Sequence, residues 1–234
     1  MQRKPGPGGF ARDRHALRSV SLATPKPRLR GVVHQWAFFV ALPAGLLLVL
    51  LAPTGRAALA AGVYAFGLCA LLGASALYHR GTWSAKVATW LRRLDHSMIC
   101  VLIAGTYTPF SLLVLEGTFA TVLLIVVWSG ALAGVLFSLL WIDAPSWVVA
   151  AIYLALGWVA VAPFPTLARE LGPAASVLLA VGGLLYTVGA VIYARRRPDP
   201  IPAVFGFHEV FHVLVVAAAL LHYIAIAVFV VPSA

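Results

Sequence analysis

The sequence predicts an all-α membrane protein: a seven-transmembrane helix bundle preceded by a basic segment. Three observations carry this prediction. The chain is 62% hydrophobic and only 10% charged, whereas soluble domains are about 45–50% apolar and about 25% charged. Seven apolar stretches approach the roughly 20 residues that a helix needs to cross a hydrocarbon core of about 30 Å. Their apolar runs are continuous rather than alternating, which favours helices over barrel strands.

Residues 1–30 form the basic segment, which is rich in Pro, Gly and Arg. We expect a mostly disordered tail that contacts anionic headgroups; an Arg-rich transit peptide is the alternative. A secretory signal is not favoured, because the first apolar run begins only near Val32 and no small-residue cleavage site lies at the expected distance. Residues 31–234 are predicted to form the transmembrane domain.

The predicted spans follow one another with short connections that leave no room for a soluble domain. They are residues 32–52, 57–78, 95–115, 119–141, 147–162, 173–194 and 208–231. The second span ends beside His79, the third begins at Asp95 and the last begins at His208. The fifth is the shortest, and the Pro163-Phe164-Pro165 sequence after it is typical of a helix end.

The positions of Lys and Arg predict the orientation. The basic segment and the second, fourth and sixth connections share one side and hold 15 of the 17 basic residues, whereas the other side holds only Arg56 and Arg169. Basic residues are enriched in cytoplasmic loops. The N-terminus is therefore predicted to be cytoplasmic and the C-terminus outside, in a multi-pass protein of the cell membrane. The net charge of +10 has this origin, so we expect membrane lipids and not nucleic acid as partners.

Four ionisable side chains are predicted to lie at one depth on the cytoplasmic side. His79 ends the second span, Asp95 begins the third, and His208 and His212 begin the seventh. Charged or ionisable groups inside a membrane are costly and indicate functional sites. The second, third and seventh spans are therefore predicted to place these ionisable side chains at the same depth in the membrane.

The spacing of these residues predicts a zinc site. His208 and His212 are separated by four positions, so their rings project from one helix face about 6 Å apart. With His79 they supply three ligands, the number found in catalytic zinc sites. Such an ion lowers the pKa of bound water to about 7, which suits attack on an ester or amide. Asp95 would hold that water or orient a histidine, and Ser75, one turn from His79, would contribute a hydroxyl.

Simpler interpretations remain open for some of these histidines. A histidine inside a membrane often makes only a helix–helix hydrogen bond. His222 lies about 15 Å deeper than His212 along the same helix, so a structural or substrate-path role is favoured over ligation. His34 and His96 lie near the interfaces, where they are expected to be solvated or packed.

Residues 208–212 also match the HExxH pattern of zinc proteases. Glu209 would then be the general base. Here the pattern opens the last span, and His222 is the only acidic residue or histidine after it. Intramembrane metalloproteases need a further carboxylate from a later span, so the context disfavours this alternative.

Four ordered motifs resemble the haemolysin III family, the bacterial relatives of the progestin and adipoQ receptors. They are residues 75–79 (SALYH), 94–96 (LDH), 103–110 (IAGTYTPF) and 208–212 (HEVFH) with His222. The resemblance covers about residue 32 to the end and implies seven spans with a cytoplasmic N-terminus. It also implies zinc held by His79, His208 and His212, a carboxylate at Asp95 that holds the zinc-bound water, and a nearby serine at Ser75.

The resemblance leaves three functions open. The wider superfamily includes alkaline ceramidases, which implies a zinc-dependent hydrolase of lipid amides or esters with a lipid amide or fatty-acid ligand. The first alternative is a non-enzymatic sensor or regulator of lipid homeostasis with structural zinc. The second is a cytolysin, which the family name implies but seven buried helices without a polar lumen do not favour. The oligomeric state does not follow from the sequence.

Overall fold

The computed structural model describes residues 26–233, and within them the chain is all-helical apart from one isolated bridge between Ile201 and Phe205. Residues 1–25 and 234, which include most of the predicted basic tail, lie outside the described part. The elements are α2 (Val32–Leu50), α3 (Gly55–Arg80), α4 (Ala85–Leu113), α5 (Gly117–Leu140), α6 (Ser146–Trp158), η1 (Val159–Val161), α7 (Phe164–Arg195), α8 (Phe207–Ala225) and η2 (Ile226–Val230). The predicted all-α class is confirmed.

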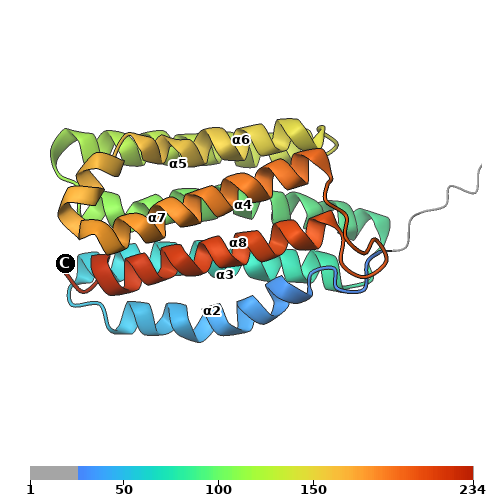
Figure 1. The fold of residues 1–234 in the computed structure, drawn as a ribbon, viewed down its shortest axis with the longest axis horizontal. Helices are drawn as coiled ribbons and strands as arrows, with labels where there is room; N and C mark the ends of the chain where they lie inside the picture. The colour runs from blue at the N-terminus through green and yellow to red at the C-terminus, as the bar shows by residue number, and fades with distance from the viewer. Residues whose placement is uncertain (1–25, 234) are drawn as a thin grey trace, which may run out of the picture.

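Six of the described helices are long and apolar enough to cross a membrane. The remaining apolar stretch, Ser146–Val161, is shorter. The helices lie side by side in an elongated bundle, with α2 along one edge and α5 and α6 along the opposite edge (Figure 1). Large apolar side chains such as Leu140 (84% exposed) and Leu51 (76% exposed) point outward, as expected of a surface solvated by lipid.

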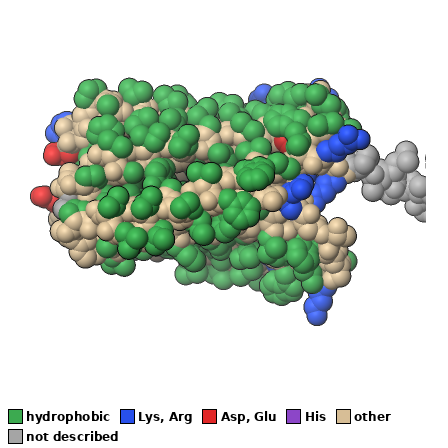
Figure 2. All heavy atoms as spheres, turned by 90° about the horizontal axis from the view of Figure 1, so that it is seen from below, with side chains coloured by type: hydrophobic (Ala, Val, Ile, Leu, Met, Phe, Trp, Pro, Cys, Tyr) green, Lys and Arg blue, Asp and Glu red, His purple; other side chains and the backbone are tan. Residues whose placement is uncertain are grey.

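Basic side chains gather at one end of this bundle (Figure 2). We call this the basic end; there α3 and α7 finish and α2, α4 and α8 begin. The C-terminus lies at the opposite end from the start of α2 (Figure 1).

The start of α4 differs from the predicted third span. The helix begins at Ala85 rather than at residue 95, because Ser84 caps it: the Val87 N–H donates to Ser84 Oγ at 3.5 Å. The added turns carry Trp90, Arg92 and Arg93. This segment is too polar to be identified as part of a span from the length of its apolar run. Asp95 therefore lies within a helix rather than at its first turn.

Glycines bring α3 and α4 close together. A Cβ built on Gly67 would lie 3.2 Å from Leu102 Cα, and one on Gly105 would lie 3.3 Å from the Val63 carbonyl oxygen. Helices in lipid associate through such packing because lipid tails offer no hydrophobic drive to association. This contact sets the end of α3 against α4, where the candidate site lies.

Candidate metal centre

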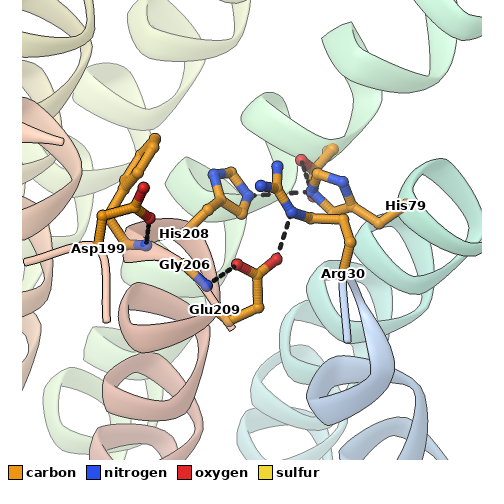
Figure 3. Close-up of polar contacts among 8 residues, drawn as sticks. Arg30, His79, Asp199, Gly206, His208 and Glu209 are labelled. Carbon is orange, nitrogen blue, oxygen red and sulfur yellow. Dashed lines mark hydrogen bonds and ion pairs between the residues drawn. The ribbon is translucent and has the colours of Figure 1, made fainter. Parts of the chain in front are cut away.

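Three histidines from two helices converge at the basic end, in a cluster able to hold a metal ion. His79 comes from the last turn of α3, and His208 and His212 come from the first turns of α8. One ring nitrogen of each can be chosen so that all lie within 4.8 Å of one another. His79 Nε2 and His208 Nε2 face each other at 3.2 Å (Figure 3). The convergence expected from the sequence is present.

The spacing of these nitrogens fits a tetrahedral zinc-like ion. Two ligands at Zn–N distances of 2.0–2.1 Å lie about 3.3 Å apart at the tetrahedral angle, close to the 3.2 Å between His79 and His208. Two nitrogens on one ion cannot be more than about 4.2 Å apart at those distances, so any pair near the 4.8 Å limit needs a small ring movement. His79 (6% exposed) and His212 (3% exposed) are buried, which keeps the cluster from bulk water.

Asp95 lies buried beside this cluster. Its Oδ2 is 3.7 Å from His79 Nε2, the same nitrogen that faces His208. An aspartate that only oriented the ring would contact the other nitrogen, Nδ1. This position suits the first of the two predicted roles, in which Asp95 holds the metal-bound water, and that role stays a prediction.

Ser75 is buried at 1% exposure, one turn before His79 on α3. Its hydroxyl lies beside the Asp95 carboxyl. The structure thus brings the predicted serine and aspartate together next to the histidines.

The loop before α8 fixes where His208 and His212 begin. The Phe207 N–H donates to Asp199 Oδ1 at 2.8 Å, and the Gly206 N–H donates to Glu209 Oε2 at 2.8 Å (Figure 3). These bonds satisfy donors at the helix start that would otherwise have no partner. The helix therefore begins one residue before His208.

Glu209 is a structural residue rather than a base. Its Oε1 forms an ion pair with Arg30 while its Oε2 accepts from Gly206 (Figure 3), and the side chain is 1% exposed. Both oxygens are thus occupied away from the histidines. The HExxH protease alternative requires this carboxylate to activate water at the metal, so the geometry argues against it.

Arg30 belongs to a short segment that the sequence analysis assigned to the tail. We call residues 26–31 the strap. Its backbone pairs with the loop before α8: the Arg28 N–H donates to the Ala203 carbonyl and the Leu29 N–H to the Val204 carbonyl, both at 3.1 Å. The strap thus ties the start of α2 to the start of α8 across the basic end.

Gly31 brings the strap into contact with the cluster. Its φ is +77°, and a Cβ there would lie 2.5 Å from His79 Cβ. No other residue fits this backbone conformation and this approach without movement. The sequence offered no signal for the contact beyond the glycine itself.

His34 is a second residue that the sequence did not place at the site. It is 2% exposed, and its ring stacks on that of His212 with centroids 3.8 Å apart and planes 7° from parallel. His34 was expected to be either solvated or packed, and in the structure it is packed. The His34 ring therefore supports the ring of His212 by stacking on it.

The remaining histidines lie outside the cluster. His222 Nε2 is 3.2 Å from the Leu179 carbonyl oxygen, and its ring lies against Gly182. This contact joins α8 to α7 and favours the structural role. His96 is half-buried on α4, and its carbonyl accepts from the Tyr153 hydroxyl at 3.1 Å.

Comparisons with known proteins agree with the motifs. A family model described as "Haemolysin-III related" matches residues 22–223. The chain is 33% identical over 169 residues to "Hemolysin-3 homolog" of Bacillus subtilis (strain 168). The aligned region covers 71% of this chain and 79% of that protein. It is 30% identical over 206 residues to "Hemolysin-3" of Bacillus cereus, covering 87% and 91%. A human relative, "Monocyte to macrophage differentiation factor", is 28% identical over 170 residues, covering 71% and 68%.

Proposed function

This chain belongs to the haemolysin-III related family, and from that premise we propose that its histidine cluster is a zinc site that hydrolyses lipid amides or esters. The protein is a multi-pass membrane protein, consistent with the cell membrane. The observation that carries the proposal is the meeting of three histidine nitrogens within 4.8 Å, with Asp95 beside them.

The proposal includes seven crossings with the basic end in the cytoplasm. Basic residues mark cytoplasmic ends, and the opposite placement of the C-terminus and the start of α2 suits an odd number of crossings (Figure 1). The short stretch of 13-residue α6 and three-residue η1 spans about 24 Å at 1.5 Å per residue. That is somewhat less than a core of about 30 Å, which a locally thinner bilayer accommodates.

Each residue then has a distinct task. His79, His208 and His212 hold the ion, which when bound supplies Lewis acidity and an activated water. Asp95 takes the proton from the attacking water, because its Oδ2 lies 3.7 Å from His79 Nε2, beside the nitrogens that would hold the ion. The Ser75 hydroxyl, buried beside Asp95, positions the substrate carbonyl or the water.

Replacing Asp95 tests this assignment. Asp95→Asn keeps the shape but removes the proton acceptor, so hydrolysis of ceramide-like or phospholipid substrates should fall by about 10²-fold or more while the metal is retained. Asp143→Asn is the matched control, because Asp143 is an 83% exposed carboxylate at the same end that pairs with Arg92. Equal hydrolysis by the two variants would contradict the proposed enzymatic activity. Absence of hydrolysis by the metal-loaded wild type would contradict it as well.

One observation favours a second candidate, a regulator with structural zinc. The strap covers the cluster through Gly31, and the cluster is largely buried. A largely buried site suits a structural ion better than a reacting one. Metal retained without hydrolysis of any lipid tested would support this candidate. The cytolysin alternative lacks comparable support, since the space between the described helices is filled by a core of apolar side chains.

A further inference from the structure

A cavity opens beside the metal centre at the basic end. Its volume is about 260 Å³. Two strap residues, two residues at the end of α3, two in the turn that follows and one on α4 line it: Lys26, Arg30, Tyr78, His79, Gly81, Trp83 and Ala88. None of the motifs in the sequence accounts for the strap or turn residues of this cavity.

The charges at the cavity are positive and only partly compensated. Arg30 is paired with Glu209, whereas no ion pair within residues 26–233 involves Lys26 or Arg80. Lys26 is exposed, and its partial desolvation together with the nearby charges of Arg30 and Arg80 lowers its pKa. Arg80 donates to the neutral side chain of Gln35 at 2.9 Å, and no carboxylate within the described residues pairs with it. An anion placed here would relieve repulsion among the three cations.

The aromatic side of the cavity is fixed in place. The Trp83 Nε1–H donates to the Leu77 carbonyl at 2.9 Å. The indole lies directly over Gly81, where a built Cβ would be 2.3 Å from the ring. Trp and Tyr rings concentrate at the headgroup level of membranes. A rigid Trp83 and Tyr78 beside two cations therefore place the cavity at the depth of lipid headgroups.

We propose that this cavity binds the phosphate group of an anionic membrane lipid, held by Lys26 and Arg30 against the wall formed by Trp83. Phosphate offers several strong acceptor oxygens, which suits Lys and Arg donors. Free phosphate shares this chemistry and is the other possible source. The site is a binding site only, so it does not depend on the proposed hydrolysis.

Titration of the full-length, detergent-purified protein with soluble ligands tests the site. The probes are dihexanoyl phosphatidic acid, dihexanoyl glycerol, which has the same chains without phosphate, and inorganic phosphate. Each is measured by calorimetry before and after treatment with chelator, since phosphate can also ligate a metal ion. The test variant is Lys26→Gln. Arg56→Gln is its control, because Arg56 is an exposed cation at the start of α3, at the opposite end of the bundle from the cavity.

We expect phosphatidic acid to bind, the glyceride to bind far more weakly, and Lys26→Gln to weaken phosphatidic acid binding about tenfold, equivalent to about 1.4 kcal/mol. Arg56→Gln should change it less than about twofold, as expected of a distant, screened charge. Equal losses in both variants, or binding that disappears with chelator but not with Lys26→Gln, would overturn the site. Equal affinity for inorganic phosphate would keep the phosphate site and overturn the lipid as its source.

Discussion

The carboxylate of Glu209 shows how much a single residue's role depends on its surroundings. Within residues 208–212 the sequence pattern offers it as a catalytic base. In the structure it caps α8 through Gly206 and anchors the strap through Arg30. The histidines could be assigned from sequence because helical spacing fixes which side chains share a face. The partner of Glu209 could not, because Arg30 lies 179 positions away and no local rule joins them.

Gly31 gives the clearest prediction for a single residue. Gly31→Ala places a methyl group 2.5 Å from His79 Cβ, so the strap or the histidine must move and metal retention should fall. Gly117→Ala is the matched control: Gly117 also has a positive φ, +63°, but nothing lies within 4 Å of its Cβ position. Both variants carry the same class of backbone strain, about 1–2 kcal/mol. Equal metal content in the two variants, measured by elemental analysis, would show that the strap contact does not support the site.

Helix boundaries were predicted well where the length of the apolar run determines them. They were predicted poorly where other interactions determine them. The end of α3 and the start of α8 lie within a few residues of the predicted limits. The first turns of α4 were missed because they are amphipathic. The predicted start of the sixth span at residue 173 corresponds to a kink, since Gly172 has a φ of 77° that interrupts α7. The preceding turns from Phe164 were assigned to a connection because they contain two charges.

Because α3 and α4 are in close contact, a larger side chain placed between them is expected to destabilise the protein. Gly67→Leu inserts a side chain where even a Cβ lies 3.2 Å from Leu102 Cα, and overpacking costs about 1–3 kcal/mol. Gly183→Leu on α7 is the control, because nothing lies within 4 Å of its Cβ position. Thermal unfolding in detergent should show a lower midpoint only for Gly67→Leu. Equal midpoints would contradict the close packing.

The whole molecule combines a basic end, where the histidine cluster lies, with an apolar outer surface (Figure 2). The class of fold followed from composition, because a chain that is 62% hydrophobic cannot cover itself with polar surface. The number of crossings is harder to predict, because Ser146–Val161 is shorter than the other six apolar helices. Orientation rests on the charge distribution, which is a property of the chain as a whole.

Cysteine labelling tests that orientation. In a variant lacking Cys69 and Cys100, Arg56→Cys at the start of α3 should react with a membrane-impermeant maleimide added to intact cells. Lys86→Cys, at the basic end, should react only after the membrane is permeabilised. Both positions are exposed at helix starts, so the difference reports the side of the membrane. The reverse pattern would place the basic end outside.

The central claim is that His79, His208 and His212 hold one zinc-like ion, and the metal content of chelator-free, detergent-purified protein tests it most directly. Wild type should contain about one zinc per chain, as expected of a single three-histidine site, and His212→Ala should lose it. His222→Ala should keep it, because His222 lies on the same helix but contacts Leu179 instead of the cluster. No bound metal in wild type, or equal metal content in wild type and His212→Ala, would contradict the site.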